Sequence, residues 1–330
     1  MKPLNWGLIG CGDIAQRRIA PAMRNIDFCS LQAVSRSNAT LLDAFADEFN
    51  VISRFADWKD LVRDPIIEAV YIATPVNLHA EMACFAARHG KHVLCEKPMG
   101  MNLSECQQMI RACKGNKVQL GVAYYRHFYP VIHEVKRIIA EGTIGDVMLV
   151  QVNAFSQFDR QLGEPRAWLL DPVQSGGGPM MDFGCHRIEV LLDLFGPIRN
   201  VKAHVTSLRY RRQVEDTAIA EMVFESGIVA SLTVTHTVAE PLDTIDIYGT
   251  LGSLHIPQLN AGDLRIDIEN KSIVRPLPPH PNLHQPLIED FTRSVLNRKR
   301  PVVDGEIGLA VNEVLDKIYL SGKNESSFTF

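Results

Sequence analysis

The sequence predicts an α/β protein of two domains: an N-terminal doubly wound parallel sheet and a C-terminal α+β domain with a mostly antiparallel sheet. The chain has 330 residues, more than one hydrophobic core usually organises, and 46% of them are apolar. Up to residue 122, short apolar runs alternate with helical stretches, whereas later strand-like runs follow one another without crossover helices. We therefore predict a first domain over residues 1–122 and a second over residues 123–330.

Five short runs of the first domain, rich in β-branched residues, are typical of buried parallel strands. They are Leu4–Ile9, Leu31–Val34, Ala69–Ala73, His92–Cys95 and Val118–Val122. Helical spacing connects them over Asp13–Arg24, Ala39–Phe49, Leu78–His89 and Ser104–Cys113. Asn38 and Ser104 are the expected N-caps, and Gly90 and Gly115 the expected stops. Alternating strands and helices predict βαβ units and hence a doubly wound sheet.

The second domain begins with a predicted helix over Val131–Glu141 and continues with seven predicted strands. These are Val147–Phe155, Val201–Leu208, Thr217–Phe224, Val229–His236, Thr244–Tyr248, Ser253–Ile256 and Leu264–Ile268. Turn signals between several of them predict hairpins and therefore antiparallel pairing. Two helices, Leu283–Asn297 and Glu306–Tyr319, are predicted to follow a proline-rich extended connection at residues 276–286.

Composition points to a small-molecule ligand. The formal net charge of −4 provides no basic field for a nucleic acid or an anionic membrane. The first residues contain no signal-peptide pattern, and no apolar run reaches the length of a membrane span. The seven cysteines include no Cys-x-x-Cys pair, which favours reduced, buried thiols over disulfides or a metal site. We expect a cytoplasmic protein without a bound metal.

The segment Gly10–Ala15 follows the first predicted strand and opens the first predicted helix. Gly10 permits a tight turn, Gly12 lets the backbone approach a pyrophosphate, and a small residue at Ala15 allows close packing on the sheet. The sequence therefore predicts a dinucleotide site that includes these three residues together with Cys11, Asp13 and Ile14.

The end of the second strand indicates which dinucleotide binds. An acidic residue there would hold a ribose 2′-hydroxyl and repel a 2′-phosphate. This chain has Ser35 and Arg36 instead, which can donate to and pair with a phosphate. We predict NADP as the preferred cofactor and NAD as the alternative.

Two further segments lie at carboxyl ends of predicted parallel strands, where ligands of such sheets bind. Thr74, Pro75, Asn77 and His79 follow one strand, and the first two are expected to wall the nicotinamide half of the cofactor. His79 falls in the first turn of a helix, a position that favours a structural role.

Glu96, Lys97 and Pro98 follow the next strand. An ammonium group at the end of a buried strand is unusual, because lysine is rarely buried without a partner. There it can hold a substrate hydroxyl and favour the negative charge that develops on the oxygen as hydride leaves. We predict that Lys97 is catalytic and that Glu96 lies with it at the cofactor.

A second segment with candidate catalytic residues begins with three glycines, Gly176–Gly178, and continues through Asp182 and His186. Four residues separate the aspartate from the histidine, so both share a face if both lie on the helix. A carboxylate beside an imidazole orients it and stabilises its protonated form, as a general base requires. Glu189, one turn beyond, is a rival partner for His186.

These motifs together resemble the glucose-fructose oxidoreductase, inositol dehydrogenase and MocA family over essentially the whole chain. The resemblance rests on Gly-x-Gly-x-x-Ala at residues 10–15, Glu96-Lys97-Pro98, the glycine run, and Asp182-x-Gly184-x-His186. It implies a Rossmann domain joined to a domain with a large open sheet that often forms homodimers or homotetramers. It also implies that Lys97, Asp182 and His186 form the catalytic set.

The resemblance extends to residues near the ligands. Tyr125 and Arg126 stand where relatives often carry polar pairs near the substrate, and we include Tyr125 and Trp168 among the cofactor-binding residues. Trp168 looks like part of a Trp-Arg segment found in some NADP-dependent members, with Leu169 in place of the arginine. His284 takes a place often held by tyrosine, and Glu189 one often held by aspartate.

The predicted function is hydride transfer between the nicotinamide and a secondary alcohol or ketone of a sugar, a cyclitol or a sugar derivative. His186 would exchange the hydroxyl proton, Lys97 would hold the oxygen, and Asp182 would hold His186. Three alternatives remain: a non-catalytic cofactor-binding sensor, an NAD-dependent glycoside hydrolase, and a dihydrodiol or tetrapyrrole reductase.

Overall fold

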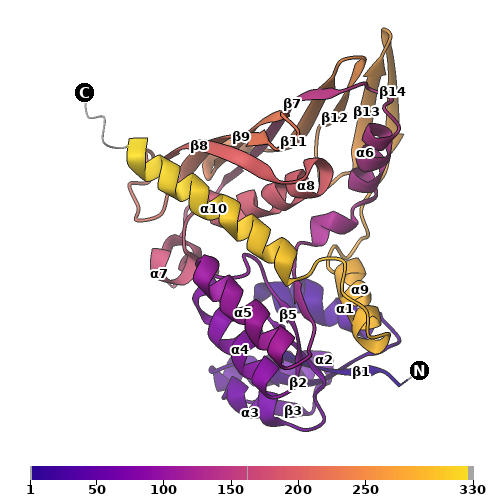
Figure 1. Cartoon of the computed structure of the whole chain (residues 1–330). Coiled ribbons are helices and arrows are strands. Elements are labelled where there is room, and N and C mark those ends of the chain that lie inside the picture. The colour runs from indigo at the N-terminus through magenta and orange to yellow at the C-terminus, as the bar shows by residue number, and fades with distance from the viewer. Residues whose placement is uncertain (1, 162, 326–330) are drawn as a thin grey trace. The chain divides into compact units, whose positions relative to one another are not determined.

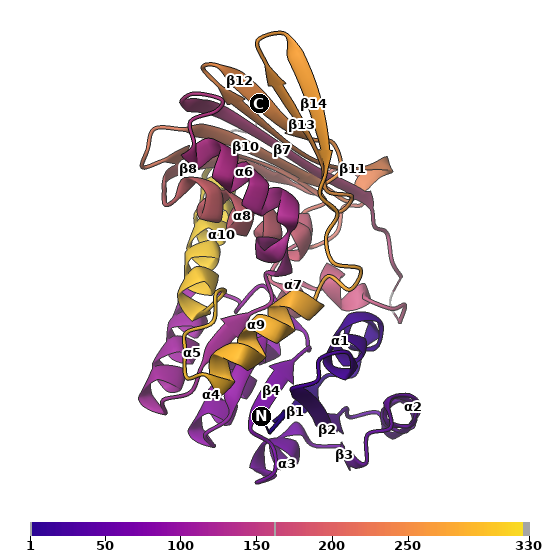
Figure 2. The same cartoon turned by 90° about the vertical axis from the view of Figure 1, so that its right-hand side faces the viewer.

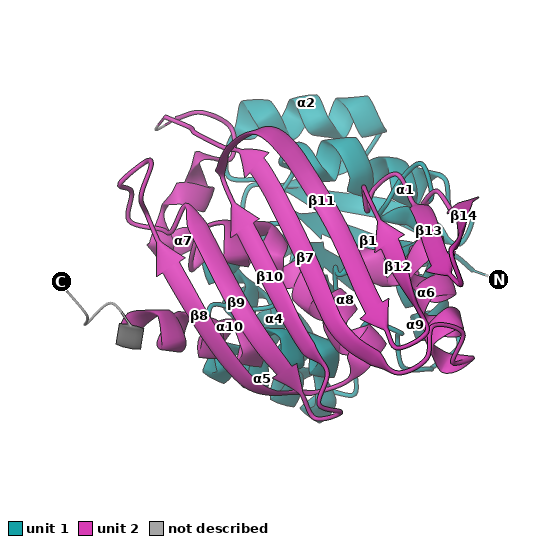
Figure 3. Ribbon diagram, turned by 90° about the horizontal axis from the view of Figure 1, so that it is seen from above, with its two compact units in different colours: residues 1–125, 280–312 teal, residues 126–279, 313–330 magenta. Residues whose placement is uncertain are grey.

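The computed structural model describes residues 2–161 and 163–325. The chain divides into two compact units (Figure 3). Unit 1 comprises residues 1–125 and 280–312, and unit 2 comprises residues 126–279 and 313–330. The predicted boundary after residue 122 lies close to the first crossing, but the prediction assigned all later residues to the second domain. The structure instead returns residues 280–312 to unit 1.

Unit 1 is built on a six-stranded parallel sheet with strand order β3-β2-β1-β4-β5-β6, of which Figure 2 labels β1 to β4. The strands are β1 (Leu4–Ile9), β2 (Cys29–Ser35), β3 (Ser53–Phe55), β4 (Ala69–Ile72), β5 (His92–Cys95) and β6 (Leu120–Val122). All four residues of β4 are buried, as expected of a strand covered on both faces. The predicted parallel sheet is confirmed, although β3 was not predicted.

The helical segments of unit 1 connect these strands, except α9, which comes from the later part of the chain (Figure 1). They are η1 (Ala15–Ile19), α1 (Ala20–Arg24), α2 (Ala39–Phe49), α3 (Trp58–Arg63), η2 (Val76–Leu78), α4 (His79–Arg88), α5 (Leu103–Gly115) and α9 (Gln285–Leu296), with η3 (Tyr125–Phe128) at the crossing. In α5 the buried residues Cys106, Met109, Ile110 and Cys113 recur at helical spacing and form one apolar stripe.

The structure corrects three details of the predicted helices. Asn102, and not Ser104, caps α5, since its side chain accepts from the backbone N–H of Glu105. Gly115 is the last residue of that helix and not a stop beyond it. The predicted helix over Asp13–Arg24 contains the π-helical turn η1. The expected cap at Asn38 is confirmed, because it accepts from the N–H of Leu41.

Helix α9 explains why unit 1 contains a late segment of the chain. Phe291 of α9 is buried, and its ring centroid lies 5.6 Å from that of Trp6 in β1. Trp6 is fully buried. The first strand therefore obtains part of its apolar cover from a segment far along the chain.

Unit 2 is built on an eight-stranded sheet with strand order β14-β13-β12-β11-β7-β10-β9-β8 (Figure 3). The strands are β7 (Val147–Gln157), β8 (Ile198–Thr206), β9 (Thr217–Phe224), β10 (Val229–Thr235), β11 (Thr237–Gly249), β12 (Gly252–Ile256), β13 (Asp263–Ile268) and β14 (Lys271–Pro276). The seven predicted strands are present, and β14 is an addition. The predicted mostly antiparallel character is confirmed, with β7 and β10 as a parallel pair.

Alternating burial shows that one face of this sheet is packed. In β9 the buried residues Ala218, Ala220, Met222 and Phe224 alternate with more exposed ones. The helical segments of unit 2 are α6 (Pro130–Ala140), η4 (Ala167–Leu170), α7 (Pro172–Ser175), η5 (Met180–Gly184), α8 (Cys185–Phe195) and the C-terminal part of α10 (Gly305–Glu325). Figure 3 shows the opposite face, which no helix in the described part of unit 2 covers.

No helix among residues 2–161 and 163–325 has both the length and the hydropathy needed to cross a membrane. The seven cysteines are free, and all but Cys29 are buried, as predicted.

Candidate active site

The glycine turn after β1 has the geometry that close approach of a phosphate requires. Gly10 has φ +94°, and a Cβ at this residue would lie 2.5 Å from the carbonyl oxygen of Ala73. A Cβ on Gly12 would meet nothing within 4 Å, so its backbone borders open space. The fully buried Ala15 begins η1. The turn therefore fits a pyrophosphate, with open space beside Gly12 and a small residue against the sheet.

The end of β2 supports this turn through hydrogen bonds. The N–H of Gly10 donates to the carbonyl oxygen of Ser35 at 3.0 Å, and the Cys11 thiol donates to the same oxygen at 3.6 Å. Burial raises the pKa of Cys11 to about 12, so the thiol stays neutral and is not a nucleophile. The Arg36 guanidinium donates to the carbonyl oxygen of Cys11. Ser35 and Cys11 thus shape the turn, and their contact with a cofactor stays a prediction.

The other residues predicted at this turn differ in exposure. Asp13 is exposed and pairs with Arg17 one helical turn later. Ile14 is half-buried at the start of the π-helical turn. Their roles at a cofactor stay predictions.

His79 joins two loops at the carboxyl edge of the parallel sheet. Its Nε2 lies 3.0 Å from the carbonyl oxygen of Thr74, and its Nδ1 lies 3.0 Å from that of Pro98. The side chain is fully buried, and burial lowers its pKa. With its two ring nitrogens beside the carbonyl oxygens of Thr74 and Pro98, His79 links the two loops, in agreement with the structural role that its place in the first helical turn favoured. A contact of His79 or of its neighbour Asn77 with the cofactor stays a prediction.

The loop that His79 reaches from β4 contains three more predicted residues. Thr74 and Pro75 are half-buried, and Asn77 in η2 is exposed. The Thr74 hydroxyl lies 3.6 Å from the sulfur of Met82. Their contact with the nicotinamide stays a prediction.

Glu96 is a buried carboxylate beside Lys97. Its Oε1 accepts from the Tyr71 hydroxyl at 2.9 Å and lies 3.3 Å from Nε2 of His284. Its Oε2 accepts from the backbone N–H of Lys97 at 3.3 Å. Burial raises the pKa of Glu96, but His284, Lys97 and the Tyr71 hydroxyl together outweigh burial, so the net direction is down. The Glu96 side chain therefore holds the backbone of Lys97, and the predicted place of Glu96 at the cofactor stays a prediction.

His284, which the sequence placed where relatives carry tyrosine, completes this cluster. It is buried, and its ring lies 4.5 Å from the half-buried ring of Tyr125 at an interplanar angle of 36°. Lys97 itself is half-buried after β5, and a cis peptide joins it to Pro98.

In unit 2, Asp182 lies in the π-helical turn η5 and His186 in the first turn of α8. The two residues belong to consecutive helical segments, but not to one regular α-helix as predicted. Oδ2 of Asp182 accepts from Arg166 at 3.1 Å and lies 3.8 Å from Nε2 of His236. The side chain of His186 is buried, with 2% exposure.

The glycine run before these residues is explained by close packing within unit 2. A Cβ on Gly177 would lie 2.1 Å from the Tyr319 hydroxyl, and a Cβ on Gly178 would lie 2.0 Å from the carbonyl oxygen of Glu215. The Glu215 carboxylate accepts from the N–H groups of Gly178 and Met180 and from the Tyr319 hydroxyl, at 2.7, 3.1 and 2.8 Å. The glycines thus let a buried carboxylate hold the start of η5.

Glu189, the rival partner proposed for His186, lies 2.7 Å from Nδ1 of His127. The other ring nitrogen of His127 lies 3.9 Å from Asp193, which pairs with Lys136 at 2.5 Å. Burial raises the pKa of Glu189. This buried ion pair links η3 and α6 to α8.

Trp168 lies half-buried in η4, directly after Arg166 and Ala167. Its predicted place against the cofactor stays a prediction.

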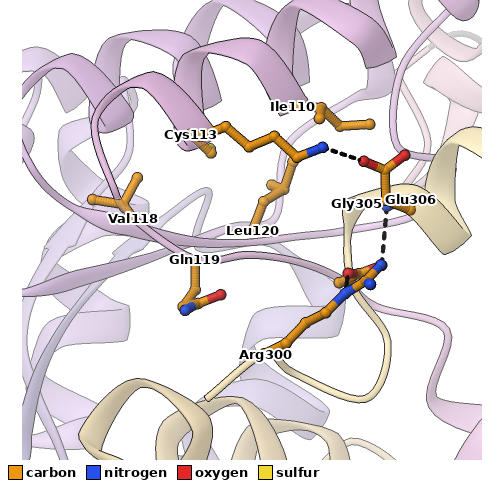
Figure 4. Close-up of a pocket in the computed structure, with 10 residues that line it drawn as sticks. Ile110, Cys113, Val118, Gln119, Leu120, Arg300, Gly305 and Glu306 are labelled. Carbon is orange, nitrogen blue, oxygen red and sulfur yellow. Dashed lines mark hydrogen bonds and ion pairs between the residues drawn. The ribbon is translucent and has the colours of Figure 1, made fainter. Parts of the chain in front are cut away.

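Unit 1 also contains a cavity of about 320 Å³ that lies between α5, β6 and the start of α10 (Figure 4). Its polar rim consists of two ion pairs, Lys114 with Glu306 and Arg300 with Asp304. None of the predicted site residues is among those that line it. It is therefore separate from the candidate site.

Sequence reasoning missed three charged or titratable residues that hold the predicted ones: Glu215, His236 and His127. Each lies far along the chain from its partner, in segments without a recognisable motif. The three glycines were the one available signal, since such a run indicates close approach of another group, but nothing in it identifies Glu215.

Comparison with known proteins supports one family. Residues 4–124 match the GFO_IDH_MocA oxidoreductase family with an NAD-binding Rossmann fold, and residues 132–255 match the GFO/IDH/MocA C-terminal domain. Oxidoreductase P35 of Formosa agariphila is 31% identical over 253 residues, which cover 76% of this chain and 78% of that protein. Trans-1,2-dihydrobenzene-1,2-diol dehydrogenase of Mus musculus is 30% identical over 280 residues, covering 83% and 81%.

A solved structure shows the same fold over nearly the whole chain. The WlbA dehydrogenase of Bordetella pertussis, in complex with NADH and UDP-GlcNAcA, is 25% identical. The two chains superpose with a TM-score of 0.87 over 98% of this chain and 96% of that one.

Proposed function

The chain belongs to the GFO/IDH/MocA family of NAD(P)-dependent oxidoreductases, and on that premise we propose that it oxidises or reduces a sugar, a cyclitol or a sugar derivative. The reaction exchanges a hydride between the nicotinamide and a secondary alcohol or ketone. The observation that carries the proposal is in unit 1. Lys97 follows β5 at the carboxyl end of the parallel sheet, the same edge at which the Gly10–Ala15 turn follows β1.

The proposed chemistry assigns one role to each of three residues. The cofactor, when bound, supplies the hydride donor or acceptor. The Lys97 ammonium holds the substrate oxygen and stabilises the negative charge that develops on it. His186 takes the hydroxyl proton during oxidation and returns it during reduction. Asp182 supplies the negative charge that stabilises protonated His186.

We propose NADP as the preferred cofactor because of Arg36. One of its guanidinium N–H groups donates to Cys11, and arginine has five such donors, so others remain for a 2′-phosphate. R36A should weaken NADP binding far more than NAD binding, as measured by calorimetry with each cofactor. R54A, which removes an exposed arginine on β3 paired with Asp43 and Asp47, is the control. Equal losses for both cofactors in R36A would contradict the assignment.

The substrate class is tested with a panel of aldoses, ketoses and cyclitols against both nicotinamide cofactors, followed by absorbance of the reduced cofactor. The proposal predicts reduced cofactor in stoichiometric amount with the oxidised product. A glycoside hydrolase that reuses its cofactor would release product without accumulating reduced cofactor. A sensor would bind cofactor and turn over nothing, and either outcome would contradict the proposal.

A second candidate substrate class is favoured by the murine relative, which is a trans-1,2-dihydrobenzene-1,2-diol dehydrogenase. Such a diol carries vicinal secondary alcohols and needs the same proton and hydride exchange. Including a trans-dihydrodiol in the panel separates the two classes, since the preferred one has the higher kcat/KM.

We further propose that the protein is a cytoplasmic homodimer or homotetramer. Seven free cysteines suit a reducing compartment. The uncovered face of the eight-stranded sheet supports assembly, because one face of the sheet has no helix of unit 2 on it. Sedimentation analysis tests this, and a monomer at micromolar concentration would contradict it.

A further inference from the structure

His236, directly after β10, is a buried histidine between charged groups. Its side chain is 1% exposed, and its ring lies 5.0 Å from that of Phe158 and 5.2 Å from that of Phe183. Its Nδ1 lies 2.6 Å from a guanidinium nitrogen of Arg212. Its Nε2 lies 3.8 Å from Oδ2 of Asp182. The imidazole therefore stands between an arginine and the carboxylate that the proposed function uses.

The neighbours of His236 determine its tautomer. An arginine only donates, so Nδ1 must accept the bond from Arg212 and is not protonated. Burial lowers the pKa of His236 more than the Asp182 carboxylate raises it, so the ring is neutral and its proton lies on Nε2. The N–H of His236 is thus on the nitrogen that faces Asp182.

This N–H has no hydrogen-bond acceptor within bonding distance among residues 2–161 and 163–325. A buried donor without an acceptor is costly, and each such group requires an explanation. The nearest charged acceptor is Oδ2 of Asp182, which also accepts from Arg166. The Nε2–H of His236 and the guanidinium of Arg166 therefore both lie nearest to the same oxygen of Asp182, Oδ2.

The two arginines of this cluster differ: hydrogen bonds hold Arg212 in place, whereas Arg166 is exposed. The Arg212 guanidinium also donates to the carbonyl oxygens of Phe158 and Glu215, at 3.0 and 3.2 Å, which fixes it behind His236. Arg166 is 45% exposed and lies over the Phe158 ring. The buried Nε2–H of His236 is thus held in a fixed place 3.8 Å from Oδ2 of Asp182, whereas the exposed Arg166 can adjust its position.

We propose that His236, fixed by Arg212, is a positioning residue that keeps the Asp182 carboxylate ionised and oriented during turnover. The inference rests on the proposed function, because it acts through Asp182. The charged and titratable groups that face this cluster are Asp182, Arg166 and Arg212, with Glu215, Asp216, Asp159 and Tyr210 next to Arg212.

The test compares three substitutions in the full chain. H236F keeps the ring between the two phenylalanines but removes both nitrogens. H236Q keeps an acceptor and a donor on two atoms bonded to one carbon, as the two nitrogens of the neutral imidazole are. H204F, at an exposed histidine on β8 of the same sheet, is the control and should behave as wild type.

H236F should lower kcat about tenfold to a hundredfold with little change in KM, because it removes the N–H that we propose serves the Asp182 carboxylate during turnover, and a donor to a charged group has an effect of that scale. The acid limb of its kcat/KM profile should move to higher pH, since loss of a donor raises the pKa of Asp182. H236Q should recover most of the activity and the wild-type profile. Unchanged kcat in H236F, or a change in KM alone as for a substrate contact, would overturn the proposal.

D182N separates this proposal from the proposed function. Wild-type turnover in D182N would refute the role of Asp182 itself. If D182N loses turnover while H236F retains it, only the positioning proposal fails. In the D182N background H236F should cause no further loss, because its effect passes through the carboxylate.

The tautomer provides a readout that does not depend on turnover or on whether H236F folds. Nitrogen-15 NMR of histidine-labelled wild-type protein, assigned by the loss of one signal pair in H236Q, should show His236 protonated on Nε2 and unprotonated on Nδ1 at neutral pH. D182N should shift the Nε2 signal. A proton on Nδ1, or a doubly protonated ring at neutral pH, would overturn the proposal.

Discussion

At the scale of the residue, the glycines of this chain serve two different purposes. Gly178 is required by packing, because a Cβ would lie 2.0 Å from a backbone oxygen that cannot move away cheaply. Gly12 is not required by packing, because a Cβ would meet nothing within 4 Å. A glycine needed by the fold can therefore be distinguished from one needed by a ligand.

G178A should lower the free energy of unfolding by about 1–3 kcal/mol, the usual cost of overpacking. Urea unfolding followed by circular dichroism measures it. G115A, at the end of α5 where a Cβ meets nothing within 4 Å, is the matched control and should stabilise by about 0.5–1 kcal/mol. Equal midpoints for G178A and wild type would contradict the packing explanation.

G12A should leave the unfolding midpoint unchanged or slightly raised, since its φ suits other residues and the space is open. It should nevertheless weaken cofactor binding, because the methyl group occupies the space into which a pyrophosphate would fit. Calorimetric titration with NAD and NADP checks this. Wild-type affinity for both would show that the turn does not hold the pyrophosphate.

At the scale of the element, ion pairs decide how α8 is held. Burial lowers the pKa of His127, but the bond and charge of Glu189 and the charge of Asp193 outweigh burial and raise it above its ordinary value of 6.5. The ionic contribution to the free energy of unfolding is therefore fully present below pH 6.5. It is lost as the pH rises through the folded-state pKa.

E189Q should accordingly lower the free energy of unfolding by about 3 kcal/mol near pH 6, where His127 is charged, and by less near pH 9. The exposed Glu141 on α6 pairs with Arg137 at 2.5 Å. E141Q is therefore the control, and it should change stability by no more than about 0.5 kcal/mol. Denaturant unfolding at both pH values provides the comparison. A loss in E189Q that is equal at both would refute a charged His127.

The helices and strands differ in how well they can be predicted from the sequence. The first strand and α2 were predicted to the residue because apolar runs and an Asn38 cap mark their ends. The three-residue β3 and six-residue α3 were missed because segments this short contain too few residues to show a period. The parallel pairing of β7 with β10 was not predicted because it joins strands separated by about half of unit 2.

At the scale of the whole molecule, the fold class, the family and the order of the two sheets follow from sequence, since alternation and motifs are local signals. The return of residues 280–312 to unit 1 does not follow from sequence. It depends on the packing of Phe291 against Trp6, two residues that lie 285 positions apart in the chain. For the same reason, the residues that contact the predicted site residues from distant parts of the chain were not predicted. The sequence shows Asp182 and Glu189, whereas His236 and His127 become visible only once strands and helices have packed.

The proposed function assigns cofactor binding to one set of residues, and proton transfer and stabilisation of charge on the substrate to another. The Gly10–Ala15 turn is built from β1, β2 and the loop after β4, and neither Lys97 nor His186 belongs to it. Cofactor at about 100 times its Kd should stabilise the protein by about 2.7 kcal/mol. The same shift in thermal unfolding is expected for wild type, K97M and H186N.

The roles of Lys97 and His186 are decided by the rate of hydride transfer in a single turnover, measured on the best substrate of the panel for wild type, K97M and H186N. We predict that both variants bind the cofactor with nearly wild-type affinity but transfer hydride at least about a hundredfold more slowly, the scale of a lost acid–base or electrostatic group. Wild-type transfer rates in both variants would contradict the catalytic roles of Lys97 and His186.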